Sequence, residues 1–478
     1  MRVSKYVQGL PLRPLAAAFA LALALDAGSA FAGPAAPRSP TVQVVTNCDD
    51  SGPGSLRDAI GAAGDGDTID LTQLACSVIS LTTGTIPIAA TDLTLQGPGA
   101  HQLMIQGNTA AHENLLYDIG GGVLSIHGVD LSFGNKYRST NIGRGGCVYT
   151  NGDLDIRDSH IYACGVHSDS YDASGGALYA QGSVTIVDTD IELCGLTTSG
   201  AARGGGVFAH SDVVMLYSSI TGCRNATSSH GYGGGVYAGG GFLMKYSTLG
   251  GNQNNDAVSG EGGGAFVKGS TLVYFSTISG NSATVGGGIL LENGAGYSAV
   301  IGASTISGNT ANAAGGVMAG VPLELKNSTI AFNTIARSYT IPIGYAFSAG
   351  LAVRAAPITV TSTIIANNIA LGTVDDPEDV GGDIPIAVDG SANLIMSSEQ
   401  PVPPDTITDD PRLAPLADNG GLTRTHRLFA GSPAIDHGTP DGFDTDQRGP
   451  GFARVQGAEA DIGAYEVDPD LIFRNGFD

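Results

Sequence analysis

Tryptophan is absent from this 478-residue sequence, and charged residues make up only 14% of it. Basic residues are scarce, since 22 lysines and arginines stand against 45 aspartates and glutamates, and the formal net charge is −23. Nucleic acids and anionic membranes bind basic surfaces, so this charge argues against both as partners. Disorder is also excluded, because 42% of the residues are hydrophobic.

Long apolar runs are equally scarce. The one candidate, Leu15 to Leu25, is too short to cross a bilayer comfortably, and we expect no transmembrane segment in the mature chain. Three basic residues precede this run and Ala30-Phe31-Ala32 follows it, which is the plan of a cleaved secretory signal over residues 1–32. The sequence therefore predicts an exported monomer, located outside the cell or on its outer surface.

Cysteine is the other scarce residue type, with six in the chain, and an exported protein can hold them as disulfides. Cys48 and Cys76 flank the first helical candidate, and we expect them to pair. Cys164, Cys194 and Cys223 occupy one position of a repeat whose neighbouring units would lie ~4.8 Å apart. Only two of these three can pair at once, and we select Cys194 with Cys223. No CxxC or Cys/His spacing indicates zinc, so no metal site is predicted.

Glycine, in contrast, is abundant, with 72 residues. Much of it lies in a recurring block of glycines and small or apolar residues that starts at positions 145, 175, 204, 233, 262 and 286 and, with fewer glycines, at 314 and 348. A second marker consists of Cys164, Cys194, Cys223, Asn252, Asn281, Asn309, Asn333 and Asn367. From residue 164 to 281 its steps are 30, 29, 29 and 29 residues, so both markers belong to one repeat.

Each repeat contains two or three short alternating strands and no helix. A propeller blade needs ~40 residues or more, and a leucine-rich repeat needs a Leu/Asn consensus, so neither fits. One coil of a parallel β-helix does fit, and it predicts an all-β solenoid with stacked ladders of like residues. The expected ladders are Ser159, Thr189, Ser218, Ser247, Ser276, Ser304, Ser328 and Ser362, and the aromatic column Tyr217, Tyr246 and Phe275. The glycine block then marks a bend with positive φ or a close approach between coils.

The two ends of the chain differ from the repeats. Residues 55–63 read as a short amphipathic helix with Ser55 and Asp58 as a capping box, and we expect this helix to cap the first coil. The predicted organisation is a signal peptide at 1–32, a cap and irregular coils at 33–135, regular repeats at 136–370, a linker and last coils at 371–408, an irregular C-terminal cap at 409–466 and a tail at 467–478.

Between each second marker and the next glycine block lies a segment that we expect to be a loop. These segments are 165–174, 195–203, 224–232 and 253–261, then only about four residues at 282–285 and 310–313, and a longer one at 334–347. Solenoids often carry function on loops stacked along one edge. The abrupt shortening predicts a step or shallow groove there.

Three segments resemble a family of bacterial exported proteins. Gly54 to Ile60 (GSLRDAI) is similar to the CSLREAI element, with glycine in place of its cysteine. The run 410–466 contains SPAID, D-x-RG and DIGAYE, and it resembles the choice-of-anchor Q domain; the ending IFRNGFD is similar to a short ending of exported Gram-negative proteins. This family has a right-handed parallel β-helix of the pectin-lyase-like fold. The resemblance therefore implies that handedness, export and surface association, and it implies no reaction.

An acidic cluster is the candidate catalytic centre. Glycoside hydrolysis uses two carboxylates ~5–9.5 Å apart, and β-elimination needs a base beside a cation. The candidates are Asp155, Asp158, Asp188 and Asp190, with Asp153, Arg157, His160 and Glu192 beside them. Asp158 and Asp188 occupy equivalent positions in neighbouring repeats, where they could bind calcium together or one could raise the pKa of the other. No other cofactor is expected. The Gly-His-Gly and Arg-x-Lys elements of polygalacturonases are missing, which favours solvated or ladder-forming acids.

A second cluster of residues is a candidate carbohydrate-binding site, because the faces of tyrosine rings and acidic side chains commonly contact sugars. The candidate ligand-binding residues are His167, Tyr171, Arg203, His230, Tyr232 and Glu261. The sequence thus predicts a surface scaffold for adhesion or for binding a polysaccharide or another cell-surface component. The alternatives are a polysaccharide lyase or glycoside hydrolase, and a purely structural role in the cell envelope.

Overall fold

A computed structural model describes residues 39–108, 113–254, 259–336, 347–371, 379–382 and 385–468. The predicted signal at 1–32 lies outside these residues, as does most of the tail at 467–478. The residues from Ser39 onward form one compact unit. Within the described part of the chain, no helix is long and apolar enough to cross a membrane.

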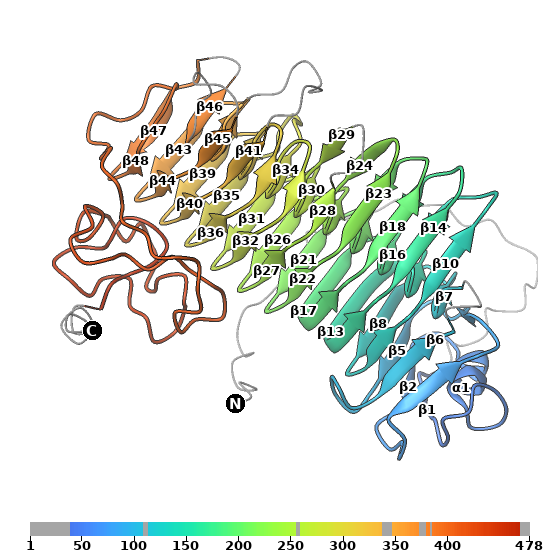
Figure 1. The fold of residues 1–478 in the computed structure, drawn as a ribbon. Coiled ribbons are helices and arrows are strands. Elements are labelled where there is room, and N and C mark those ends of the chain that lie inside the picture. Colours follow the sequence, from blue (N-terminus) through green and yellow to red (C-terminus); the bar gives the residue numbers. More distant parts are fainter. Residues whose placement is uncertain are drawn as a thin grey trace, which may run out of the picture. The chain divides into compact units, whose positions relative to one another are not determined.

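The described chain winds into the predicted right-handed parallel β-helix (Figure 1). Its strands form sheet A with 23 strands, sheet B with 11, sheet C with nine and sheet D with five. A regular coil consists of β13 (Asp153–Tyr162) in sheet A, β14 (Gly165–Ser168) in sheet C, β15 (Ala173–Ser174) in sheet D and β16 (Leu178–Ala180) in sheet B. Sheet A extends from β1 (Val42–Val44) to β48 (Leu394–Ile395), and sheet B from β4 (Ile86–Ile88) to β46 (Val380–Gly382).

Successive coils stack in register, so that equivalent residues form the core. Ile156 of β13 pairs with Ile186 of β17 (Val184–Glu192), and the same core position is filled by Met215, Met244, Val273, Ile301, Leu325 and Val360. All of these side chains are buried. The glycine block makes the predicted bend: Gly175 has a φ of 64°, and a Cβ on Gly176 would lie 1.9 Å from the carbonyl oxygen of Gly205 in the next coil.

The predicted ladders are present, with one shift at the last regular coil. The backbone N–H of Ser159 donates to the hydroxyl of Thr189 at 3.3 Å, and this pattern continues along the column to Ser328. Ser328 then donates to Thr363 instead of the predicted Ser362. Likewise Asn368, not Asn367, accepts from Asn333. Ser362 and Asn367 instead occupy the left-handed bends just before these positions, so the prediction was wrong by one residue.

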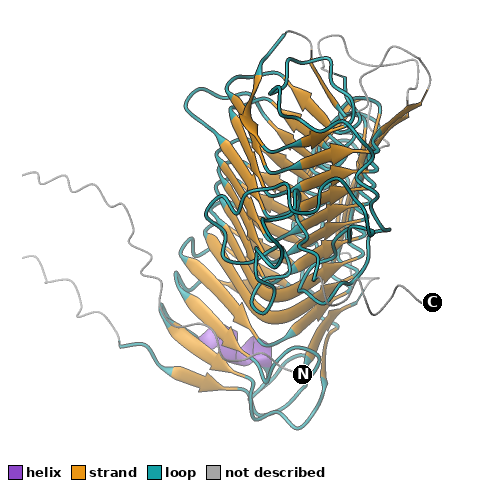
Figure 2. Cartoon of the chain, turned by 90° about the vertical axis from the view of Figure 1, so that its left-hand side faces the viewer, coloured by secondary structure: helices purple, strands orange, loops and turns teal. Residues whose placement is uncertain are grey.

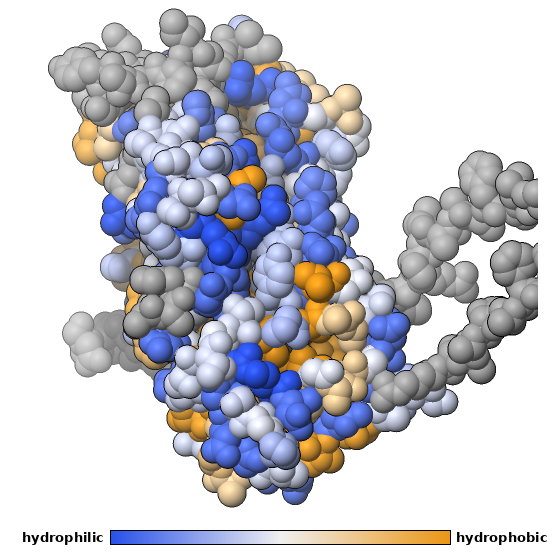
Figure 3. Space-filling view, turned by 90° about the vertical axis from the view of Figure 1, so that its right-hand side faces the viewer, coloured by the Kyte–Doolittle hydropathy of each residue, from blue (hydrophilic) through white to orange (hydrophobic). Residues whose placement is uncertain are grey.

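The N-terminal cap is the helix that the sequence predicts. Helix α1 (Leu56–Ala62) begins after Ser55, whose hydroxyl accepts a hydrogen bond from the backbone N–H of Asp58 at 3.2 Å. Leu56 and Ile60 are buried in the core that runs through the coils, and Figure 2 shows the helix at the end of the first coils. Figure 3 faces this end and shows an area of apolar side chains among hydrophilic ones.

All six cysteines are paired. The structure joins Cys48 to Cys76 and Cys194 to Cys223, which are the pairs that the sequence predicts. It also joins Cys164 to Cys147 of the glycine block, a pair that the column argument missed. Cys147 lies directly before β12 (Val148–Thr150) of sheet B, in the coil that precedes the one with Cys164, and it gives the third cysteine of the column a partner 17 residues away.

In their described parts, the segments predicted as loops contain short strands, and most of the segment 334–347 lies outside the described residues. Those from 165 to 261 contribute to the nine-stranded sheet C and the five-stranded sheet D, which pack together through Val166, Ala173, Leu196 and Ala202. Sheet C contains β10 (Asn135–Arg138), β14, β18 (Gly195–Thr198), β23 (Arg224–Thr227), β28 (Gln253–Asn254), β33 (Ser282–Ala283), β37 (Thr310–Ala311), β41 (Thr334–Ala336) and β45 (Ile369–Leu371). Sheet D contains β11 (Gly143–Arg144), β15, β19 (Ala202–Arg203), β24 (His230–Tyr232) and β29 (Ser259–Glu261), and it ends where the segments shorten.

The C-terminal region, residues 409–467, is irregular as predicted and packs along the outer face of sheet A. Its contacts reach β32 (Thr277–Ser279), β36 (Thr305–Ser307), β40 (Thr329–Ala331) and β44 (Ile364–Ala366). Gln447 bonds to Thr277 and Thr305, and the hydroxyl of Ser307 lies 2.7 Å from His426 Nε2. The region therefore ties several coils together, in addition to contacting the last one.

Candidate functional site

The predicted acidic cluster lies on the outer face of sheet A, on β13 and β17. Asp155 accepts two hydrogen bonds of 2.9 Å from Arg157 Nε, and His127 Nε2 lies 3.5 Å from it. Burial alone would raise the pKa of the Asp155 carboxyl, but the nearby side chains of His127 and Arg157 outweigh burial and lower it. Asp155 is therefore an ion-paired carboxylate. Asp190 has a different partner, since it accepts a 2.5 Å hydrogen bond from the hydroxyl of Ser219.

Asp158 and Asp188 form a separate pair one coil apart. Both have positive φ angles, 45° and 47°, and equivalent bends in later coils hold Tyr217, Tyr246 and Phe275. Aspartate tolerates this left-handed conformation better than most side chains, which gives both residues a structural role. Burial and then repulsion from Asp158 raise the pKa of Asp188, in the direction that the shared column predicts.

A histidine and aspartate cluster lies on the same face, and sequence reasoning missed it. His101 Nδ1 lies 3.4 Å from Asp130 Oδ2, and His160 Nδ1 lies 3.9 Å from the same oxygen. The spacings of 29 and 30 residues are close to one coil each, and this was the signal available in the sequence. Asp130 and His160 are register partners in β9 (Asp130–Ser132) and β13. His101, however, comes from a turn before β6 (Met104–Gly107) in the irregular first coils.

Five of the six predicted ligand-binding residues lie on two different sheets, and the sixth, Tyr171, lies between these sheets. His167 is on the outer face of sheet C, where its Nε2 lies 2.9 Å from Asp169. Tyr137, which the prediction did not include, donates a 2.6 Å hydrogen bond to Asp169 and stacks on His167 with ring centroids 5.3 Å apart. The bonds from Tyr137 and His167 lower the pKa of the Asp169 carboxyl. Tyr171, at 47% exposure, follows in the connection to sheet D.

The other four predicted residues lie on sheet D. Arg203 donates to Asp172 at 2.9 Å and lies 5.9 Å above the ring of Tyr232. Tyr232 also contacts the ring of His230, at 6.5 Å between centroids, and is a register partner of Glu261. Val166 and Ala173 face each other between the sheets, so strand alternation places His167 and Arg203 on opposite outer faces. The six residues therefore do not form one site.

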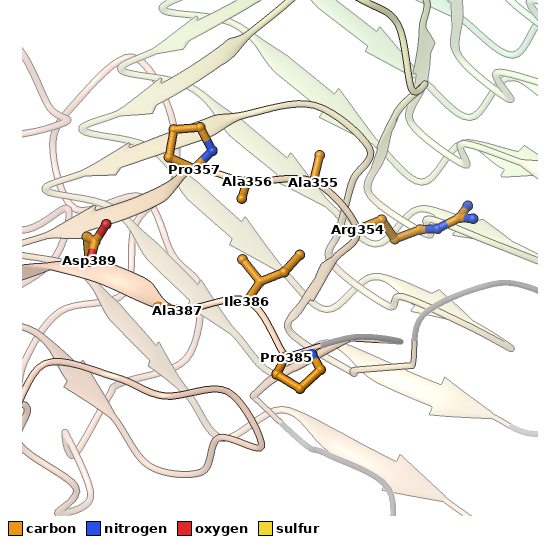
Figure 4. A pocket seen from close by; sticks show the side chains of 8 residues that line it. All are labelled: Arg354, Ala355, Ala356, Pro357, Pro385, Ile386, Ala387 and Asp389. Atoms are coloured by element: carbon orange, nitrogen blue, oxygen red, sulfur yellow. The ribbon is translucent and has the colours of Figure 1, made fainter.

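The described surface includes a hollow on sheet C and another near the last coils. The larger, of about 700 Å³, lies on the outer face of sheet C and is lined by Tyr137, His167, Leu193, Thr197, Arg224 and residues between them; we call it the sheet C groove. The other, of about 600 Å³, lies between residues 354–357 and 385–389. Figure 4 shows Ile386 pointing toward the first of these segments, with small and apolar neighbours. The second hollow offers few polar groups to a ligand.

Comparison with known proteins gives this chain no relative: no family model, no curated protein and no solved structure matches it. The class of the protein is therefore defined by its own structure: it is a parallel β-helix protein with three disulfides.

Proposed function

We propose that this chain is an exported or surface-associated β-helix scaffold for adhesion, and that it binds a glycan in the sheet C groove. One observation carries the proposal: Tyr137 and His167 stack on this open surface and share the carboxylate of Asp169. Carbohydrate sites commonly combine a planar aromatic face with fixed polar groups. The carboxylate accepts hydrogen bonds, and the aromatic faces contact the apolar side of a sugar ring.

Leu193 and Arg224 extend the groove beyond the aromatic pair. Leu193 is 58% exposed and adds apolar surface to the lining of the groove. Arg224 is the first residue of β23, and β14 and β18 lie between β23 and β10 in sheet C. Because sheet C is a ladder of equivalent positions, the groove runs across coils and suits an extended polymer better than a single sugar.

Export is supported by the signal pattern at 1–32 and by three disulfides, which persist in oxidising compartments. The resemblance to the pectin-lyase-like, CSLREAI and choice-of-anchor Q family supports surface association. Gly54 to Ile60 forms the cap around α1, and the motifs between 432 and 466 contribute buried residues of the C-terminal region. These motifs act as structural parts, which agrees with a scaffold.

A glycan array tests the proposal. We expect the wild-type protein to bind a restricted set of polysaccharides, and Tyr137→Ala and His167→Ala each to weaken that binding by about 10-fold, since an aromatic contact contributes about 0.5–1.5 kcal/mol beyond the area that it buries. Tyr297→Ala is the matched control, because Tyr297 is an exposed tyrosine outside the groove. Absence of binding at high protein concentration, or equal loss in the control, would argue against a glycan site in sheet C.

A polysaccharide lyase or hydrolase is the alternative, and the raised pKa of Asp188 is the observation that favours it. The test is a cleavage screen on pectin, alginate and related polymers with the double variant D158N/D188N. Asparagine is chosen because it tolerates the positive φ at both positions. Cleavage by the wild type that the double variant lacks would replace the scaffold proposal. A purely structural envelope role predicts neither cleavage nor glycan binding.

A further inference from the structure

We propose that His101, Asp130 and His160 bind a divalent transition-metal ion, with zinc as the reference ion, on the outer face of sheet A. One nitrogen of each histidine and one oxygen of Asp130 lie within 4.8 Å of one another. The proposal concerns a different sheet from the glycan groove and does not depend on it.

The distances fit an ion with only small movements. Zinc binds imidazole nitrogen and carboxylate oxygen at about 2.0–2.1 Å, so two ligand atoms around a tetrahedral ion lie about 3.3 Å apart. His101 Nδ1 is 3.4 Å from Asp130 Oδ2, and His160 Nδ1 is 3.9 Å from it. The first pair already has the required separation. For the second, His160 Nδ1 must move toward Asp130 by about half an ångström, and the histidine ligand nitrogens already lie within 4.8 Å of each other.

The carboxylate at the centre is held in place. The other oxygen of Asp130, Oδ1, accepts a 2.9 Å hydrogen bond from the backbone N–H of His101. The same bond fixes the turn that carries His101, which has a φ of 62°. Asp130 therefore turns its free oxygen toward both imidazoles, and its side chain is only 12% exposed. Asp130 and His160 meet because their coils stack in register, whereas His101 reaches them from the turn before β6, whose Met104 is the register partner of Asp130.

Glu192 adds a partner on the far side of His160. Its Oε2 lies 3.8 Å from His160 Nε2, the nitrogen that does not face Asp130. A metal-bound histidine usually donates its other N–H to a carboxylate, which fixes the ring and its tautomer. Glu192 is thus placed to orient His160 while Nδ1 binds the ion, and we assign it this positioning role.

The ligand types select the ion. Two imidazoles and one carboxylate suit zinc and neighbouring transition metals, whereas calcium and magnesium prefer sites made of oxygen alone. The site is also open, since the side chain of His101 is 67% exposed. Three protein ligands on an open surface leave at least one coordination position for water or for a ligand oxygen. The net charge of −23 raises the local concentration of cations.

Titration of the tag-free, chelator-treated protein with Zn²⁺ in a calorimeter tests the proposal. We expect one ion per chain, and His101→Asn and Asp130→Asn each to weaken binding at least ~100-fold. Asparagine suits position 101 because it tolerates positive φ and the turn is exposed, so this variant retains the fold. Glu192→Gln should weaken binding by about 10-fold, the effect expected for a positioning residue.

His210→Gln is the control, because His210 is an exposed histidine outside the cluster; its affinity for Zn²⁺ should equal that of the wild type. Co²⁺ bound in place of Zn²⁺ should give the absorption bands of nitrogen and oxygen ligation, and these should disappear in His101→Asn. Two results would overturn the proposal: no saturable binding by the wild type, or equal binding by the wild type and the folded His101→Asn variant.

Discussion

At the scale of single residues, Asp50 organises the N-terminal cap. Arg57 of α1 donates to it at 2.8 Å, and the backbone N–H groups of Thr82 and Thr83 donate at 2.8 and 2.6 Å. Burial alone would raise the pKa of the Asp50 carboxyl, but these hydrogen bonds outweigh it and hold the pKa well below its ordinary range. One carboxylate thus joins the helix to the turn that follows β3 (Val78–Leu81).

We predict that Asp50→Asn lowers the free energy of unfolding at pH 7 by about 2 kcal/mol, because hydrogen bonds to a charged group contribute about 1.5–3 kcal/mol. A depressed carboxyl pKa stabilises the fold above the unfolded value of 3.8, and that stability is lost as the pH falls below it. The variant should therefore lose less stability than the wild type between pH 5 and about pH 3 in urea denaturation. Asp49→Asn, at an exposed neighbour, is the control and should match the wild type.

At the scale of elements, the asparagine column connects five coils through the core. Asn281 Nδ2 donates to Asn309 Oδ1 and to the carbonyl of Leu249, both at 3.0 Å. Its own Oδ1 accepts from the backbone and the side chain of Asn252, at 2.9 and 3.0 Å. Every polar atom of this fully buried side chain is bonded, so the column satisfies backbone groups at a bend where sheet hydrogen bonds are interrupted.

We predict that Asn281→Ala destabilises the protein by about 3 kcal/mol or more, because it leaves the N–H of Asn252 and the carbonyl of Leu249 buried without these partners. Since each coil contacts only its neighbours, the loss should be local. Amide hydrogen exchange should therefore accelerate around residues 249–252 before it does at α1. Asn293→Ala, at an exposed position, should change neither measurement. Uniform acceleration along the solenoid would contradict the local picture.

Periodicity explains which elements the sequence could predict. The period of 29 residues maps each column onto one line of stacked coils, so the bends at the glycine blocks and most of both ladders followed directly. The prediction of the ladder residues was wrong at Thr363 and Asn368 because the preceding coil is longer than the others. The neighbouring residues Ser362 and Asn367 have the residue types expected in the ladders and were chosen instead. The strands of sheets C and D were missed because they are only two to four residues long and mostly polar. That length carries too little alternation to separate them from loops.

The candidate sites show the same limit. Asp158 and Asp188 were placed together correctly, since both lie in regular coils. The cluster at Asp130 needed His101, which reaches it from an irregular coil whose register the sequence does not define. The residues predicted to bind a glycan do not form one site, because His167 lies on sheet C and Arg203 lies on sheet D.

At the scale of the whole molecule, the C-terminal region contacts several coils and is itself held together by a buried network of charged side chains. Arg448 donates to Asp446 at 2.6 Å and lies between the rings of Phe452 and Tyr465, at 4.1 and 3.9 Å. Glu466 accepts from the backbone N–H of Asp461 at 2.9 Å, and Arg454 Nη1 lies 3.5 Å from it. The motifs of this region therefore form its core, and its attachment to sheet A depends on that core.

Glu466 makes this attachment sensitive to pH. Burial raises the pKa of its carboxyl to about 7, although bonds from Asp461 and Gln456 and the charge of Arg454 oppose the shift. A carboxyl whose pKa is raised on folding stabilises the folded state fully below its unfolded value of 4.5, and that stability is lost as the pH rises through 7. The raised pKa of Asp461 acts in the same direction.

We therefore predict that unfolding of the C-terminal region becomes easier by up to about 3 kcal/mol between pH 5 and pH 8. The measurement is urea denaturation at several pH values, followed by the near-UV signal of Tyr465 and its neighbours. Glu466→Gln cannot titrate, so its curve should be flatter over this range, whereas Glu459→Gln, at an exposed position, should keep the wild-type slope. If Glu466→Gln keeps that slope as well, the pH dependence arises elsewhere, and Glu466 is ionised in the folded protein throughout the range.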